Sequence, residues 1–133
     1  MTSPQWRILC VEDHPETRDL LKLLFNLQGY EVAFATTLAE GLRLAQSERF
    51  DLFLLDNWLP DGMGIELCRQ IREFDHETPI VFYSLWDTKA DRQRGLEAGA
   101  QAYVGKLRDS EALVQTIARL IEERAARGTS TRA

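Results

Sequence analysis

The chain has 133 residues, of which 44% are hydrophobic and 28% are charged, with a formal net charge of −5. This length fits a single domain, and the composition is that of a soluble globular protein rather than a disordered one. The acidic balance argues against nucleic-acid binding, and no apolar run reaches the roughly 18 residues of a membrane helix. Because residues 1–7 contain no apolar signal segment, we expect a cytoplasmic protein without membrane or nucleic-acid partners.

The chain contains two cysteines, Cys10 and Cys68. They are too few and too far apart in sequence to indicate a zinc site or a disulfide framework. Each falls within an apolar or helical pattern, so both are expected to be reduced, buried packing residues.

Short apolar runs alternate with helical patterns, which is typical of a parallel sheet covered by helices. The first run, Ile8–Val11, is continuous, as in a strand buried on both faces. Pro15 then begins a helix that Gly29 ends. Four leucines of this helix recur at helical spacing and are expected to face the core: Leu20, Leu23, Leu24 and Leu27.

The pattern continues with a short strand over Glu31–Ala35 and a helix that ends near Glu48. Thr37, followed three residues later by Glu40, predicts a capping box at the start of this helix. A strongly apolar run then predicts a third buried strand over Asp51–Asp56.

Turn-forming residues predict a loop over Leu59–Gly64, with a third helix after it that ends near Phe74. We expect a fourth strand over Pro79–Tyr83, a fourth helix over Asp87–Ala98 and a fifth strand over Ala102–Val104.

The last helix is predicted over Asp109–Arg124, with a buried face formed by Leu113, Ile117, Leu120 and Ile121. Residues 125–133 are polar and are expected to form a frayed tail. We therefore predict one domain over residues 1–124 and a polar C-terminal tail over 125–133.

Five strand–helix units in this order predict an α/β fold with a doubly wound, five-stranded parallel sheet. In such sheets, ligands bind at the carboxyl ends of the strands. In the flavodoxin-like strand order 2-1-3-4-5, the first and third strands are neighbours, so Glu12, Asp13 and Asp56 would converge. Carboxylates that lie so close repel one another unless a cation intervenes. A hard divalent ion such as Mg²⁺ is the natural partner.

Two more polar residues follow strands at the same edge, Ser84 after the fourth and Lys106 after the fifth. A hydroxyl and an ammonium group beside a metal-bound carboxylate make a suitable phosphoryl site. The nucleophile would be the carboxylate of Asp56, giving an aspartyl phosphate.

Over roughly residues 6–124, the chain resembles the receiver domains of bacterial two-component systems and is similar to the single-domain chemotaxis regulators. The resemblance rests on Glu12-Asp13, Leu55-Asp56, Pro60-Asp61-Gly62, Ser84, Tyr103 and Lys106. It implies the flavodoxin-like (βα)5 fold and a phosphorylation site that uses Mg²⁺.

The resemblance also implies individual roles. Asp56 would be the phosphoacceptor, and Lys106 would hold the phosphoryl group. Asp13, Asp56 and the backbone carbonyl of Trp58 would bind Mg²⁺ directly, whereas Glu12 would act mostly through water.

Two further residues would form the switch. After phosphorylation, Ser84 would move towards the phosphoryl group, and Tyr103 would turn inward to fill the vacated space. This movement would alter the surface formed by the fourth helix, fifth strand and fifth helix.

The sequence departs from the family pattern at three positions. Leu107 follows Lys106 where receivers usually have proline in a cis peptide, which favours a trans peptide and a different direction for the Lys106 side chain. Leu85 is larger than the usual residue after Ser84 and would narrow access to Asp56. Glu12 stands where aspartate is commoner, which is a mild change.

Several of these residues also have simpler interpretations. Asp13 alone could cap the helix that starts near Pro15. His14 is interpreted as an exposed residue at the start of that helix, and His76 as loop surface. Trp58 and Trp86 could pack against the chain or form a surface that recognises a partner.

The leading interpretation is a phosphorylation-dependent signalling switch. A histidine kinase or histidine phosphotransfer protein would donate the phosphoryl group, and phosphorylation would change contacts with a downstream protein or a second copy of the chain. The chain would not be an enzyme for a separate substrate, although it would assist its own phosphotransfer and autodephosphorylation. The chain could act alone or be the receiver of a longer protein.

Two alternatives remain. An atypical receiver would bind partners without being phosphorylated, with Leu85 and Leu107 as its support. A phosphatase of the haloacid dehalogenase type would need a second acid two residues after the nucleophile, where this chain has Trp58.

Overall fold

The computed structural model of the chain describes residues 6–107 and 110–132. Its main sheet has five parallel strands in the spatial order β2-β1-β3-β6-β7. These strands are β1 (Trp6–Val11), β2 (Tyr30–Ala35), β3 (Leu52–Leu55), β6 (Ile80–Ser84) and β7 (Ala102–Gly105). Counted within this sheet alone, the order is the predicted 2-1-3-4-5, so the flavodoxin-like topology is confirmed.

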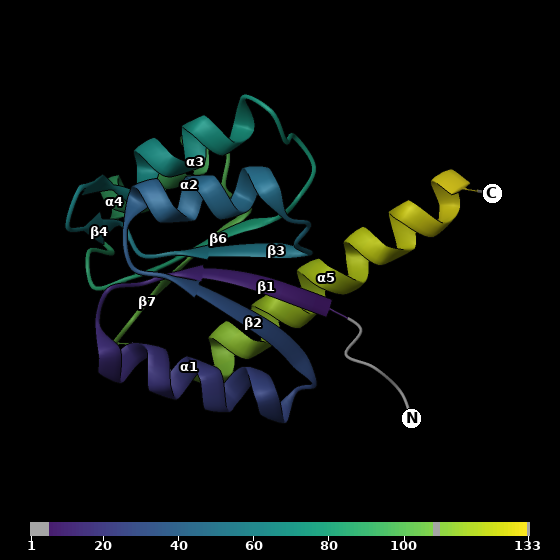
Figure 1. Ribbon diagram of the computed structural model, residues 1–133, viewed down its shortest axis with the longest axis horizontal. Coiled ribbons are helices and arrows are strands. Elements are labelled where there is room, and N and C mark those ends of the chain that lie inside the picture. The colour runs from purple at the N-terminus through teal and green to yellow at the C-terminus, as the bar shows by residue number, and fades with distance from the viewer. Residues whose placement is uncertain (1–5, 108–109, 133) are drawn as a thin grey trace.

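Five helices cover the two faces of the sheet (Figure 1). One face carries α1 (Pro15–Leu27) and α5 (Ser110–Arg132). The other face carries α2 (Leu38–Ser47), α3 (Gly64–Arg72) and α4 (Lys89–Ala98). No helix in the described part of the chain is long and apolar enough to cross a membrane.

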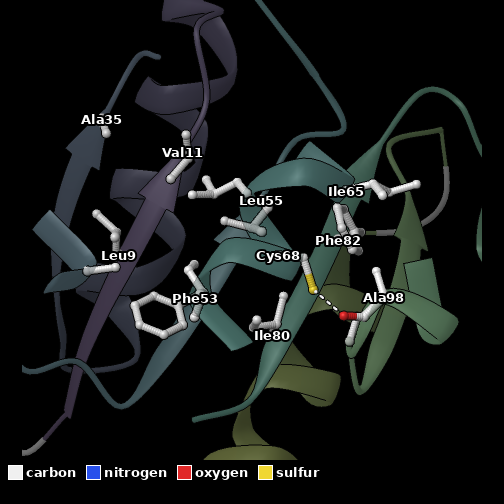
Figure 2. Close-up of a cluster of buried hydrophobic side chains, with 14 of the residues drawn as sticks. Leu9, Val11, Ala35, Phe53, Leu55, Ile65, Cys68, Ile80, Phe82 and Ala98 are labelled. Carbon is white, nitrogen blue, oxygen red and sulfur yellow. Dashed lines mark hydrogen bonds between the residues drawn. The ribbon is translucent and has the colours of Figure 1, made fainter. Parts of the chain in front are cut away.

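Each strand contributes side chains to two separate hydrophobic cores, one on each face of the sheet. In β1, Leu9 and Val11 pack under α2 and α3, whereas Ile8 and Cys10 pack under α1 and α5. Successive side chains of a strand point to opposite faces, so the continuous apolar runs of the sequence follow from burial on both sides. Figure 2 shows the first of these cores.

Both cysteines are free and buried, as predicted. The Cys68 thiol donates a 3.5 Å hydrogen bond to the carbonyl oxygen of Ala98, which joins α3 to the end of α4 (Figure 2).

The core face of α1 differs from the prediction. Leu21 and Phe25 are fully buried, whereas Leu20, Leu23 and Leu27 are exposed. The predicted face was wrong because apolar residues fill most positions from 20 to 27, so several helical stripes fit the spacing equally well. Packing against the sheet selects the stripe through Leu21 and Phe25, with Leu24 partly buried beside them.

The helix caps largely follow the sequence signals. Thr37 caps α2 by accepting a hydrogen bond from the Glu40 amide, as predicted. Gly29 follows α1 with a φ of 81°, in the left-handed region that favours glycine. The start of α4 was predicted too early, because Thr88 and Asp91 form a capping box that begins the helix at Lys89.

Two boundaries near α3 also differ. The helix ends at Arg72 rather than near Phe74. The predicted loop over Leu59–Gly64 contains part of a small antiparallel pair, β4 (Trp58–Leu59) with β5 (Gly62–Met63).

Asp61, in the turn between β4 and β5, joins this hairpin to α2. Its carboxylate accepts hydrogen bonds from the amides of Leu38, at 2.7 Å, and Ala39, at 3.0 Å. The first turn of a helix has amides without intrahelical partners, so this carboxylate satisfies two of them.

The segment after Arg124, predicted as a frayed tail, is helical, because α5 continues to Arg132. Its last turns extend beyond the sheet (Figure 1). The predicted helix end was wrong because polarity alone does not stop a helix, and residues 125–127, Ala-Ala-Arg, are strong helix formers. Asp109, the predicted first residue of this helix, lies outside the described residues, and the domain boundary at residue 124 stays a prediction.

The new assignment of the α1 core face can be tested with two matched substitutions. Leu21→Ala is expected to lower the free energy of unfolding by about 2 to 5 kcal/mol, since it opens a cavity in a packed core. Leu23→Ala, on the exposed face, is expected to change it by less than about 0.5 kcal/mol. Urea unfolding of both variants measures the difference. Similar losses for the two would contradict this packing.

Candidate functional site

The carboxyl ends of β1 and β3 bring three acidic residues together. Val11 and Leu55 are direct partners in the sheet, so Glu12 and Asp56, each one residue further, lie side by side. Ligand atoms of Glu12, Asp13, His14 and Asp56 all lie within 4.8 Å of one another. The predicted convergence of the three carboxylates is therefore present, with His14 added to it.

Lys106, which follows β7, extends its ammonium group into this cluster. The Nζ atom lies 2.8 Å from Oε1 of Glu12 and 3.3 Å from Oδ2 of Asp56. Both carboxylates are buried, with exposed fractions of 1% for Glu12 and 4% for Asp56. The peptide bond before Leu107 is trans, and Lys106 still reaches the carboxylates in this arrangement.

The buried charges shift the acid–base behaviour of the cluster. Burial, followed by the charge of Glu12, raises the pKa of Asp56 to about 6, although Lys106 opposes this shift. Burial lowers the pKa of Lys106, but its hydrogen bond to Glu12 and the charge of Asp56 outweigh this, so the net shift is upward. Lys106 is therefore positively charged at neutral pH, when Asp56 is mostly ionised.

Asp13 carries the feature that best fits a cation. Its Oδ1 atom is buried and has no hydrogen-bond partner among the described residues. The alternative role as a helix cap is not present, because His14 occupies the N-cap position of α1. Besides the 3.3 Å contact with His14 Nδ1, this buried oxygen accepts no hydrogen bond from the described residues, and with two further carboxylates beside it the donor set suits a hard divalent ion.

Glu12 already has partners on both oxygens. Lys106 contacts Oε1, while Oε2 accepts a 3.2 Å hydrogen bond from the backbone amide of His14 and lies 3.1 Å from its Nδ1 atom. Trp58 lies close to Asp56, because its amide donates a 3.3 Å hydrogen bond to the Asp56 Oδ1 atom.

The two predicted switch residues are joined through Trp86. Ser84 is fully buried at the end of β6, and its hydroxyl oxygen accepts a 3.1 Å hydrogen bond from the Trp86 amide. The Tyr103 hydroxyl donates a short hydrogen bond to the carbonyl oxygen of Trp86. The Tyr103 ring stacks on Phe82, with 5.2 Å between ring centroids.

The sequence interpretation missed Asn57, which is buried directly after Asp56. Its side chain accepts a 3.1 Å hydrogen bond from the Ile65 amide and donates at 3.4 Å to the Tyr103 hydroxyl. Asn57 thus connects the acidic cluster, the start of α3 and the switch tyrosine. A second polar residue after the fully apolar strand, directly following Asp56, is the signal that could have indicated it.

Gly64, the first residue of α3, allows this helix to lie against the loop that follows β3. A Cβ atom at this position would come within 2.2 Å of the carbonyl oxygen of Asp56. The Gly64 amide instead donates a 2.9 Å hydrogen bond to the Asn57 carbonyl oxygen.

Four apolar side chains near the site are exposed to solvent. Trp58 and Trp86 have exposed fractions of 57% and 55%, and their ring centroids are 5.8 Å apart. They therefore pack on each other while more than half of each surface stays free for a partner. Leu85 and Leu107 are exposed as well.

Residues 8–118 match the response regulator receiver domain family. The chain belongs to this family. Receiver domains of response regulators are phosphoacceptor switches phosphorylated by histidine kinases.

Several known proteins are similar to this receiver. Response regulator MprA of Mycobacterium leprae is 34% identical over 115 residues, which are 86% of this chain and 50% of that protein. A CheY-like receiver domain protein from Methanospirillum hungatei JF-1 has a TM-score of 0.86 at 30% identity, covering 92% of this chain and 98% of that one. This receiver spans about half the length of the curated relatives it matches.

A further solved structure concerns the metal. The receiver domain of the sensor histidine kinase PA1611 from Pseudomonas aeruginosa PAO1 has a TM-score of 0.81 at 28% identity, covering 88% of this chain and 98% of that one. That structure holds a magnesium ion coordinated in the active-site cleft.

The raised pKa of Asp56 makes the stability of this receiver depend on pH. The folded pKa of about 6 lies above the value of about 3.9 expected for an unfolded chain. As pH rises through this window, the unfolded state releases its proton first, so the wild type loses stability. In metal-free buffer, Asp56→Asn is expected to raise the free energy of unfolding at pH 7.5 by about 1 to 3 kcal/mol.

Urea unfolding of both proteins at pH 4.5 and pH 7.5 measures this effect. The stability difference should be smaller at pH 4.5, where the folded wild type keeps Asp56 largely protonated. An equal difference at the two pH values would contradict a raised pKa.

Proposed function

We propose that this receiver accepts a phosphoryl group on Asp56, with Mg²⁺ bound beside it. One observation carries the proposal: the buried Asp56 carboxylate lies 3.3 Å from the ammonium group of Lys106 and in one cluster with Asp13, whose buried Oδ1 atom accepts no hydrogen bond from the described residues. This arrangement combines a nucleophile, a fixed positive charge and a donor set for a cation in a single cluster.

The transfer follows from the chemistry of these groups. An Asp56 carboxylate oxygen forms a bond to phosphorus as the bond from phosphorus to the donor breaks, giving an acyl phosphate. Lys106 binds the phosphoryl oxygens and offsets the charge that develops on them. When bound, Mg²⁺ supplies further positive charge to those oxygens.

Four residues are proposed to hold the ion. Asp13, Asp56 and the backbone carbonyl of Trp58 would bind it directly. Glu12 would act through water, which agrees with the partners that already occupy both of its oxygens.

The donor would be a histidine kinase or a histidine phosphotransfer protein, and the output would be altered binding to a downstream protein or to a second copy of the chain. This receiver would assist its own phosphotransfer and autodephosphorylation, rather than act on a separate substrate. The free, buried cysteines are consistent with a protein that functions in the reducing cytoplasm.

The proposed switch uses the contacts around Trp86. Movement of Ser84 towards the phosphoryl group would lengthen the hydrogen bond that its hydroxyl oxygen now accepts from the Trp86 amide. Inward movement of Tyr103 would break its hydrogen bond to the Trp86 carbonyl. Both changes act on the segment between β6 and α4, so phosphorylation would reshape the surface around α4 and β7.

The phosphotransfer chemistry is tested with acetyl phosphate and intact-mass measurement. Wild-type protein is expected to gain one phosphoryl group in Mg²⁺ and none in EDTA. Asp56→Asn should gain none, because an amide is not a nucleophile of this kind. Asp61→Asn is the matched control, since it removes a nearby carboxylate outside the cluster, and it should be modified like the wild type.

If wild type stays unmodified by both acetyl phosphate and a histidine kinase, the phosphorylation-independent interaction module replaces this proposal. Turnover of phosphate esters would instead favour a phosphatase.

The switch is tested by NMR with beryllofluoride, a stable mimic of the phosphoryl group. In the presence of Mg²⁺, the amide signals of Trp86 and Tyr103 are expected to shift, because both residues lie in the hydrogen-bond path from Ser84. The same additions should leave Asp56→Asn unchanged. Shifts confined to the residues around Asp56 would argue against the coupling through Trp86.

A further inference from the structure

We infer that His14 is a nitrogen ligand at the proposed cation site, so that it strengthens binding of transition-metal ions relative to Mg²⁺. This inference rests on the proposed function, because it adds a residue to the same site. It starts from the position of the imidazole ring: Nδ1 lies 3.1 Å from Oε2 of Glu12 and 3.3 Å from Oδ1 of Asp13.

The separations of these atoms fit one coordination sphere. An octahedral ion with ligands at about 2.1 Å places adjacent ligand atoms about 3.0 Å apart and opposite ones about 4.2 Å apart. The imidazole nitrogen lies near the first of these separations from Oδ1 of Asp13, at 3.3 Å. Its 3.1 Å contact with Glu12 is a hydrogen-bond distance to a carboxylate proposed to act through water. The ligand atoms of His14, Asp13 and Asp56 lie within 4.8 Å of one another, so small side-chain rotations would bring them around one ion.

The imidazole contacts Glu12 and Asp13, and the helix that follows does not use it. His14 is the N-cap residue of α1, but within the described part of the chain its side chain makes no capping hydrogen bond to that helix. Its side chain is 58% exposed, so the ring can reach an ion from the solvent side of the cluster. The neighbouring Asp13 oxygen is the buried atom without a hydrogen-bond partner.

The chemistry of the ligands then predicts a preference. Mg²⁺ favours oxygen ligands and keeps several waters, so it gains little from an imidazole. Co²⁺ and other later first-row ions bind imidazole well. A carboxylate site without histidine also binds Co²⁺ more tightly than Mg²⁺ to some degree. A ligand role for His14 is therefore shown by the loss of Co²⁺ preference when its imidazole ring is removed.

A positioning role for His14 would change the two metal affinities in a different way from a ligand role. If the imidazole only donated a hydrogen bond to Glu12 and positioned its carboxylate, removing the ring would change the affinity for both ions in the same proportion. The ratio of the two affinities therefore separates a ligand from a positioning residue.

The experiment measures the affinities for Co²⁺ and Mg²⁺ by isothermal titration calorimetry. It uses the full-length chain without an affinity tag, and tryptophan fluorescence serves as a second readout. For His14→Ala, we expect Co²⁺ affinity to fall by about tenfold or more. Mg²⁺ affinity should change by less than about twofold, since water can replace the ring. His76→Ala removes the other histidine, which lies on the exposed surface, and should leave both affinities unchanged.

The outcomes separate the two proposals. Equal weakening of both ions in His14→Ala, or no loss of Co²⁺ affinity, overturns the ligand role of His14 and leaves the phosphorylation site intact. Failure of wild type to bind either ion overturns the proposed cation site itself, and the ligand role with it. Asp13→Asn checks this second point independently, because it should weaken both ions.

Discussion

The pairing of two buried carboxylates with one ammonium group is the constraint on which the site depends. Glu12 and Asp56 are both buried at the sheet edge, and Lys106 lies within ion-pair distance of each. One positive charge does not balance two negative charges, so the cluster keeps an excess of negative charge. Burial, together with the charge of Glu12, raises the pKa of Asp56, and the proposed cation would offset the excess negative charge.

The sheet order creates this crowding, and α3 maintains it. A crossover places β3 beside β1, which puts Asp56 next to Glu12. The start of α3 is held against the same loop, because the Asn57 side chain accepts a hydrogen bond from the Ile65 amide. Gly64 has no side chain to clash with the Asp56 backbone. The loop that carries Asp56, the proposed phosphoacceptor, is therefore fixed by contacts on several sides before any ligand binds, which reduces the ordering that phosphotransfer would require.

The sequence predicted those features that one strong local signal determines. Apolar runs gave the main strands, Thr37 gave the start of α2, and acidic residues at strand ends gave the cluster. Prediction failed where several solutions fit locally, as in α1, where tertiary packing chose Leu21 over Leu23. It also missed Asn57, whose partners are distant in sequence and are brought near only by the fold.

Asn57 and Trp86 show how charge at the cluster can reach the surface. Asn57 is bonded to Asp56 through the chain and to the Tyr103 hydroxyl through its amide group. The same hydroxyl donates to Trp86, whose amide donates to Ser84. In the proposed switch, a phosphoryl group on Asp56 would therefore act on Tyr103 by two routes, through Asn57 and through Ser84 with Trp86. Because both routes end on one hydroxyl, Tyr103 cannot move without changing the hydrogen bonds on both sides, which favours a concerted switch over independent local shifts.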